Sequence, residues 1–220
     1  MVKRQKNYNC NDYKCIRMQR ILVIFLLFFI LYIPKALANG NGSGVRTEKG
    51  KVSEPSPVPS VFLLDKGVQS PQRIMEFMLG FNSQLDSSYI RRLIKTYLVE
   101  CSLEGINYEI AICQMCLETG FLRFGGSVSR FQNNFCGLGA TDAFTAGDWF
   151  GSMEEGVRAH IQHLKAYASV DPIKTPVVDK RLKRVRRGTV ITVYDLTGRW
   201  AADPDYGSKI TYLLKKLYLN

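Results

Sequence analysis

Apolar residues recur at the spacing of an amphipathic helix in several stretches of this chain. Most of these stretches follow a residue that can cap a helix N-terminus, and in one case a proline occupies the first helical position. Helices are therefore expected over about 71–80, from 87 onward, over 108–118, from 153 onward and over about 205–217. The predicted caps are Ser70, Asp86, Asn107 and Ser152, the last within a Ser-x-x-Glu capping box.

The rest of the chain carries little strand pattern. Residues 190–194 form one strand-like run, residues 170–188 form a long basic loop, and residues 39–60 form a linker rich in glycine and proline. A folded region is expected to begin near Val61. The chain is thus predicted to hold one mainly helical domain, residues 61–220, behind a flexible linker.

The first 38 residues have the order of a secretion signal. Basic residues come first, thirteen apolar residues run from Ile21 to Ile33, and Ala36 and Ala38 supply the small residues that a signal peptidase reads. We predict cleavage after Ala38 and export to the periplasm or the exterior, with contact to the membrane only through this segment before cleavage. An uncleaved membrane anchor is the alternative.

Much of the formal net charge of +11 belongs to the predicted signal segment. Seven of the 30 basic residues and one of the 19 acidic residues lie within residues 1–38. Residues 180–187 hold six cations in eight positions. Export and the lack of a recognition-helix context argue against binding of nucleic acid. A solvated loop, or attraction to anionic polymers of the cell envelope, accounts for the run.

Glu118 is the first candidate for chemistry. It ends a nearly all-apolar helical run that begins at residue 110, and it precedes a Thr-Gly break. A carboxyl group at the end of a buried helix can hold its proton near neutral pH, as a general acid must. A capping or ion-paired glutamate is the alternative for such a residue taken alone.

Further blocks with a chemical character follow Glu118 in order. They are Asn-Asn-Phe-Cys-Gly-Leu-Gly at 133–139, Ser-Met-Glu-Glu-Gly at 152–156 and Trp-Ala-Ala-Asp-Pro-Asp-Tyr at 200–206. Together with Leu-Glu-Thr-Gly at 117–120, they make residues 72–217 resemble the bacterial endo-β-N-acetylglucosaminidases of glycoside hydrolase family 73. The resemblance implies a mainly α, lysozyme-like α+β fold, with a small β-lobe beside the active-site cleft.

The resemblance also implies catalytic roles. Glu118 would be the general acid that protonates the glycosidic oxygen, and Tyr206 would line the cleft beside it. A second carboxylate is expected in the lobe over 139–150, where Asp142 and Asp148 are slightly favoured over the glutamates at 154 and 155. Alternatively, the substrate's own N-acetyl group assists, and no second carboxylate is required.

Four more residues are predicted to bind the substrate. Asn133 and Asn134 suit hydrogen bonds to acetamido groups or to loop backbone, and Gly137 permits close approach of a sugar. Trp149 is the favoured residue for stacking on a sugar ring. Other aromatic candidates are Phe121, Phe124 and Trp200.

Cysteines and histidines contribute no predicted metal site or cofactor. The four cysteines after the linker are interpreted as small core residues, with a structural disulfide through Cys101 or Cys136 as the alternative. His160 and His163 lie one helical turn apart, and a packing role is favoured over metal binding. The other two cysteines are Cys113 and Cys116.

The sequence therefore predicts an exported, monomeric hydrolase that acts on peptidoglycan glycan strands. Its predicted reaction is cleavage of the β-1,4 bond after N-acetylglucosamine, with Glu118 as the acid. A muramidase or lytic transglycosylase of the same fold is one alternative. A wall-binding module without catalysis is another.

Overall fold

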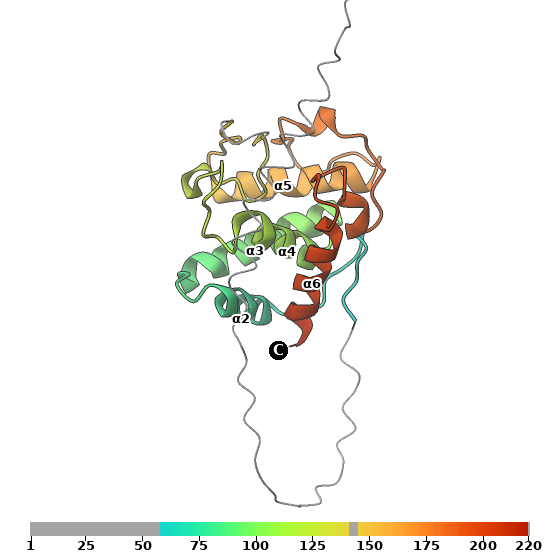
Figure 1. Ribbon diagram of the computed structural model, residues 1–220. Coiled ribbons are helices and arrows are strands. Elements are labelled where there is room, and N and C mark those ends of the chain that lie inside the picture. Colours follow the sequence, from blue (N-terminus) through green and yellow to red (C-terminus); the bar gives the residue numbers. More distant parts are fainter. Residues whose placement is uncertain (1–57, 141–144, 220) are drawn as a thin grey trace, which may run out of the picture.

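A computed structural model of the protein describes residues 58–140 and 145–219. These residues form α-helices and short 3-10 helices joined by loops (Figure 1). The helices are α2 (Pro71–Phe81), α3 (Ser87–Glu104), α4 (Tyr108–Thr119), η1 (Arg130–Gln132), α5 (Met153–Ala168), η2 (Leu182–Arg184), η3 (Val193–Leu196) and α6 (Tyr206–Leu219). The mainly helical prediction is thereby confirmed.

The predicted caps explain where four of these helices begin. The side chains of Ser70, Asp86, Asn107 and Ser152 each accept a hydrogen bond from a backbone N–H in the first turn of the following helix. The capping box differs in detail, because the Glu155 carboxylate accepts from the backbone N–H of Gly151, at 2.7 Å, instead of from the cap itself. Local sequence thus determines the helix starts.

Helix α4 lies in the middle of the fold. Nearly every residue from Glu109 to Cys116 is buried, which matches a helix that is apolar on all its faces. Helix α3 packs against α2, α4 and α5, and α6 packs against α4 and α2 (Figure 1). These contacts bury a continuous core, against which the last turn of α4 packs.

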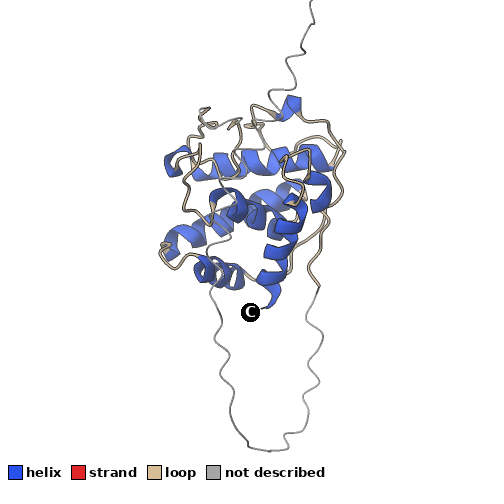
Figure 2. Ribbon diagram, viewed as in Figure 1, coloured by secondary structure: helices blue, strands red, loops and turns tan. Residues whose placement is uncertain are grey.

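The strand prediction over 190–194 is wrong. Phe62 and Thr192 make an isolated antiparallel bridge, but the chain then turns into the 3-10 helix η3. The Asp195 carboxylate accepts from the backbone N–H groups of Ile191 and Thr192, and this local capping competes with an extended conformation. Figure 2 shows helices and loops, without a strand among the described residues.

The predicted β-lobe over 139–150 stays a prediction. Residues 145–150 are loop, and residues 141–144 lie outside the described ranges. The backbone N–H of Asp148 donates to the carbonyl of Leu138 at 2.7 Å, which draws the two ends of this loop together. The lobe region is therefore closed at its base beside α5.

The predicted signal and most of the linker lie outside the described residues. None of the described helices combines the length and the hydropathy that crossing a bilayer requires. The four cysteines of the described region are buried free thiols, as the core interpretation predicts. The disulfide alternative is not borne out by their geometry.

Candidate active site

Glu118 occupies the last turn of α4, where the helix gives way to an unusual turn. Gly120, Phe121 and Leu122 all have positive φ values, of 57°, 56° and 61°. Bulky residues rarely adopt this left-handed conformation, so tertiary contacts must hold it. The Phe121 ring stacks on Phe81 with centroids 4.2 Å apart, and the Asn82 amide donates to the Phe121 carbonyl at 2.9 Å. The turn after Glu118 is thus anchored to α2.

The two oxygens of the Glu118 carboxyl group have different surroundings. Oε1 accepts hydrogen bonds from the Tyr206 hydroxyl and from the Trp200 indole Nε1, the latter at 3.1 Å. No described residue donates a hydrogen bond to Oε2. A Cβ atom on Gly137 would lie 3.8 Å from Oε2, so this oxygen faces the Gly137 loop across a narrow space. As far as residues 58–140 and 145–219 are concerned, Oε2 is therefore the oxygen that can carry and release a proton.

Burial raises the pKa of Glu118 to about 7, from an ordinary value of 4.5. The hydrogen bonds from Tyr206 and Trp200 lower the pKa, but they do not offset the cost of removing a charged carboxylate from water. No ion pair among the described residues involves this carboxylate. A group that titrates near neutrality can be protonated when substrate binds and ionised after it has donated its proton.

A buried line of hydrogen bonds extends from Glu118 into the core. The Gln114 amide Nε2 donates to the Tyr206 hydroxyl at 2.8 Å. His160 Nε2 lies 3.0 Å from the Gln114 amide oxygen, and the Tyr97 hydroxyl lies 2.9 Å from His160 Nδ1. Burial lowers the pKa of His160 to about 3, so its imidazole is neutral. Sequence analysis missed this connection.

Signals for it were nevertheless present. Gln114 is a polar residue in an apolar helical run, four positions before Glu118 and thus on the same face of α4. His160 follows the packing prediction, and its polar partners lie on α3 and α4. His163 contacts the Asp179 carboxylate at 2.7 Å and packs edge-on against the Trp200 ring. Neither histidine belongs to a cluster of potential metal ligands within the described residues.

The Asn-Asn-x-x-Gly loop is shaped by its own side chains. Asn134 is fully buried; its amide donates to the carbonyls of Leu138 and Asp148 and accepts from the N–H of Leu138. Asn133 donates to the carbonyl of Phe150 at 3.0 Å. Of the two roles considered for these asparagines, the structure shows bonding to loop backbone. The loop in turn places Gly137, with φ of 71°, next to Glu118.

The two candidates for a second carboxylate differ in what the structure describes. Asp148 is paired with Arg181 at 3.0 Å, and Arg181 also reaches the carbonyl of Gly139. Gly139 has a φ of 86°, which favours glycine, and a Cβ atom there would crowd the ends of both side chains of this pair. Asp142 lies outside the described residues. Asp148 thus links the loop that follows Gly139 to the basic loop over 170–188.

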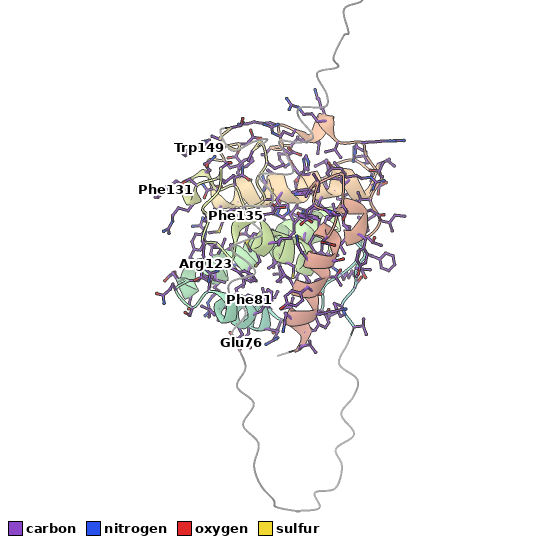
Figure 3. The ribbon with its side chains drawn as sticks, in the orientation of Figure 1. Glu76, Phe81, Arg123, Phe131, Phe135 and Trp149 are labelled. Atoms are coloured by element: carbon purple, nitrogen blue, oxygen red, sulfur yellow. The ribbon has the colours of Figure 1, made fainter. Side chains whose placement is uncertain are left out.

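Aromatic side chains around this region fall into exposed and buried groups. Trp149 and Phe131 are 59% and 75% exposed, and Figure 3 places both on the same edge of the molecule. Their segments are joined, because the N–H of Phe150 donates to the carbonyl of Gln132. Phe121 is buried in the core, whereas Trp200 donates a hydrogen bond to Glu118. Trp149 therefore remains open for contact with a ligand, and Phe131 is a further open ring beside it.

Two comparisons with known proteins bear on this geometry. The family described as glucosaminidase, mannosyl-glycoprotein endo-beta-N-acetylglucosaminidase, matches residues 94–219. This range contains Glu118, the Asn-Asn loop, Trp200 and Tyr206. A protein of Borreliella burgdorferi (strain ATCC 35210 / DSM 4680 / CIP 102532 / B31), described as an uncharacterized protein, is 43% identical over 196 residues, which are 88% of this chain and 94% of that protein.

Proposed function

Because the chain belongs to the glucosaminidase family of glycoside hydrolases, we propose that it cleaves the β-1,4 bond after N-acetylglucosamine in peptidoglycan, with Glu118 as general acid. The family supports a hydrolase that acts on the cell wall. The observation that carries the proposed role of Glu118 is the free Oε2 of a carboxyl group whose pKa lies at about 7. The proposal extends to the bond that is cut and to the acid that assists its cleavage.

The proposed reaction uses the asymmetry of the carboxyl group. Tyr206 and Trp200 hold Oε1, so the proton of the neutral acid is carried by Oε2, which faces Gly137. Transfer of this proton to the glycosidic oxygen allows the leaving sugar to depart as an alcohol. The hydrogen bonds from Tyr206 and Trp200 then stabilise the carboxylate that remains.

Two mechanisms for the second half of the reaction are compatible with the site. An inverting reaction needs a carboxylate base across the sugar, for which Asp142 and Asp148 are the proposed residues. Asp148 would have to act while paired with Arg181. A substrate-assisted reaction uses the acetamido group instead and retains the configuration at the anomeric carbon. Proton NMR of the first product anomer distinguishes inversion from retention.

Substrate binding is proposed for the exposed side of the same region. Trp149 would stack on a sugar ring, and the Gly137 loop would let the glycan approach Glu118 closely. Asn133 and Asn134 would act indirectly, because they hold the loop in shape. Export, guided by residues 1–38, would bring the protein to its polymer.

The test is digestion of purified peptidoglycan by the wild type and by Glu118→Gln, with mass spectrometry of the products. New reducing ends at N-acetylglucosamine support the proposal. Reducing ends at N-acetylmuramic acid would identify a muramidase, and anhydro products would identify a lytic transglycosylase. Binding to the polymer without release of any fragment would point to a non-catalytic wall-binding module.

A further inference from the structure

A positively charged hollow of about 470 Å³ lies next to the site just described. It is lined by Tyr167, Arg184, Arg186, Thr189 and Arg199. The Tyr167 ring packs against Trp200 with centroids 6.1 Å apart, and its hydroxyl donates to the carbonyl of Arg199 at 2.9 Å. Trp200 also donates a hydrogen bond to Glu118, so the rings of Tyr167 and Trp200 connect the hollow to the acid.

Among the arginines of the hollow, Arg199 has an acidic neighbour in the described part of the protein, Asp195, whose pKa is lowered mainly by a backbone hydrogen bond and to a smaller extent by the Arg199 charge. No ion pair there includes Arg184, Arg186 or Arg199. Other cations of the same basic segment are used internally: Arg181 pairs with Asp148, and Arg187 donates to the carbonyl of Asp171. Some cations of this segment therefore hold the loop in place, and others face solvent.

The backbone around the hollow is fixed before any ligand arrives. The N–H groups of Gly188 and Val190 donate to the carbonyls of Ala166 and Tyr167 at the end of α5. Arg184 belongs to η2, and the Arg199 guanidinium donates to the carbonyl of Asp195. Guanidinium groups on a fixed backbone suit planar carboxylates, which they bind with paired hydrogen bonds.

We propose that this arginine hollow binds a carboxylate of the peptide that branches from the glycan strand. The proposal rests on the proposed function, because it takes peptidoglycan as the polymer. Peptides branch from alternate sugars of such a strand and carry free carboxylates. A strand whose glycosidic oxygen meets Glu118 would bring a neighbouring peptide over Trp200 and Tyr167. The hollow would then make the protein prefer strands that still carry their peptides.

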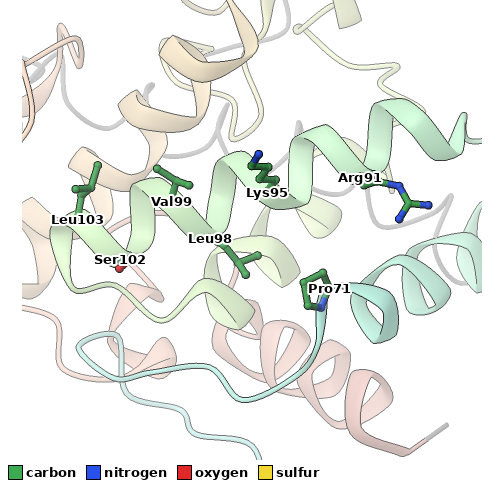
Figure 4. Close-up of a pocket in the computed structure, with 7 residues that line it drawn as sticks. All are labelled: Pro71, Arg91, Lys95, Leu98, Val99, Ser102 and Leu103. Carbon is green, nitrogen blue, oxygen red and sulfur yellow. The ribbon is translucent and has the colours of Figure 1, made fainter.

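The experiment measures binding in the Glu118→Gln background, so that cutting does not enter the result. The polymers are soluble glycan strands with their peptides and the same strands after an amidase has removed the peptides. The test variant adds Arg184→Gln, Arg186→Gln and Arg199→Gln. The control variant instead adds Arg91→Gln and Lys95→Gln on the exposed side of α3 (Figure 4), and Lys215→Gln on α6. Both variants lose three positive charges.

We expect the Glu118→Gln protein to bind peptide-bearing strands about tenfold more tightly than stripped strands. The test variant should lose this preference, and the control variant should keep it. Equal binding of both polymers by the Glu118→Gln protein would overturn the proposal. So would an equal loss of preference in the control variant, which would indicate general attraction between charges. Failure of the wild type to cut either polymer would count against the proposed function and leave the binding result intact.

A second inference comes from the buried line between α3 and Glu118. Its four hydrogen bonds have one consistent direction: Tyr97 donates to His160, neutral His160 donates to Gln114, Gln114 donates to Tyr206, and Tyr206 donates to Glu118. Tyr97, Gln114 and His160 are fully buried. A hydroxyl that accepts one hydrogen bond becomes a better donor of the next.

We infer that Gln114 and His160 are positioning residues, which aim the Tyr206 hydroxyl at Glu118 Oε1 without touching the substrate. Each interior member has both a partner to accept from and a partner to donate to. Removing one member would leave the next free to turn away from its acceptor. The expected consequence is a weaker hydrogen bond to Glu118 instead of a direct loss of the acid.

Other ionisable groups lie near this chain of hydrogen bonds. Cys136, on the loop before Gly137, has a pKa raised by burial and is a neutral thiol. His163 is engaged with Asp179, and the pKa of Tyr206 lies well above its ordinary value, mainly through burial. Asp148 is paired with Arg181. With a pKa of about 7, Glu118 is expected to set the basic limb of the pH profile.

The test compares pH profiles of kcat/KM for Gln114→Met, Tyr206→Phe and the double variant. The hydrogen bond from Tyr206 lowers the pKa of Glu118, so its loss should keep the acid protonated to higher pH. The basic limb should move to higher pH in Tyr206→Phe and move in the same direction, but less, in Gln114→Met. The double variant should match Tyr206→Phe, because the two residues act through one bond.

A second pair of variants guards against a failure of Gln114→Met to fold. His160→Gln retains a donor and an acceptor and should keep the wild-type profile, whereas His160→Leu should shift the basic limb to higher pH. Lower thermal stability with an unmoved basic limb in both Gln114→Met and His160→Leu would overturn the inference. An added shift from Gln114→Met in the Tyr206→Phe background would overturn it as well.

Discussion

Helix α4 carries a glutamate at each end, and the two carboxyl groups have opposite surroundings. Glu109, in the first turn, accepts from the backbone N–H groups of Val68 and Gln69, both at 2.6 Å, and from the Tyr218 hydroxyl at 2.7 Å. Both of its oxygens are occupied. Glu118, in the last turn, accepts hydrogen bonds from described residues at Oε1 alone. The first carboxyl group ties the chain together, and the second keeps an oxygen free.

The direction of the helix adds to the difference. A negative charge is favourable at a helix N-terminus and unfavourable at a C-terminus, where carbonyl groups point outward. Glu109 lies near the N-terminus of α4, and Glu118 lies near the C-terminus, where a negative charge is opposed. Glu109 is fully buried, whereas Glu118 is partly exposed. The two carboxyl groups also differ in how many hydrogen-bond donors contact them and in the end of the helix at which they lie.

The largest expected effect is that of Glu118→Gln on activity. The amide keeps an acceptor for Trp200 and Tyr206 but cannot donate an acidic proton. We expect kcat/KM on peptidoglycan to fall by roughly 10³-fold, within the range for loss of a general acid. Rates of release of reducing ends measure it, and an unchanged far-ultraviolet circular dichroism spectrum serves as the folding control. Activity within a few-fold of wild type would remove Glu118 from the mechanism.

Glu109→Ala should show the opposite pattern. It leaves two backbone N–H groups and the Tyr218 hydroxyl without their acceptor, so the free energy of unfolding should fall by about 3 kcal/mol. Urea unfolding measures this change. Activity per folded molecule should stay near that of wild type below the unfolding transition. A stable protein with lost activity would contradict the structural role of Glu109.

The pH dependence of stability should report on the surroundings of Glu118. The pKa of Glu118 is about 7 in the folded protein, whereas the ordinary value of a glutamate is 4.5. The folded protein therefore binds this proton more tightly than the unfolded chain does. The stabilisation that results is present below pH 4.5 and is lost as pH rises through 7.

Glu118→Gln removes this titration. The variant should therefore become more stable than wild type as pH rises, by on the order of 2 kcal/mol at pH 8, after allowance for partial exposure of the side chain. Urea unfolding of both proteins at pH 4 and pH 8 provides the measurement. A difference that does not change with pH would show that Glu118 titrates at an ordinary value in the folded protein.

Tyr218→Phe should give the smallest effect, and it is the matched control for Tyr206→Phe. Each substitution removes one hydroxyl that donates to a glutamate of α4. Tyr218→Phe should cost about 1 kcal/mol of unfolding free energy and leave the pH profile of activity unmoved. Thermal unfolding and the basic limb of kcat/KM are the two readouts. A moved limb in this variant would mean that the two ends of α4 are electrostatically coupled.

Much of the fold was accessible from local pattern. Ser70, Asp86, Asn107 and Ser152 cap their helices as predicted, because capping depends on residues within one turn of each other. The strand predicted at 190–194 failed for a related reason. The β-branched and aromatic residues of this run were outweighed by Asp195, whose carboxylate caps η3. Short runs of mixed pattern leave strand and turn close in free energy.

The candidate site was accessible only in part. Glu118 was identified from the apolar run that ends at it, and Tyr206 from the block at 200–206. The contribution of Trp200 as a donor to Glu118 was missed, as was the partnership of Gln114 with Tyr206, 92 residues away in the chain. Arg181 was seen as one cation in a run, although its position opposite Asp148 closes the loop. Local pattern marks Gln114 as a polar residue in an apolar run, but it does not identify a partner at such a separation.

The sequence by itself determined where the helices begin, that α4 is buried on all sides and that an acid ends it. These properties follow from interactions within a few residues and from the apolar composition of the helix. Tertiary structure decided which oxygen of Glu118 is held and which is free, because Tyr206, Trp200 and Gly137 arrive from distant segments. A carboxyl group acquires a pKa near 7 from such an arrangement of donors and burial, and the arrangement exists only after the chain has folded.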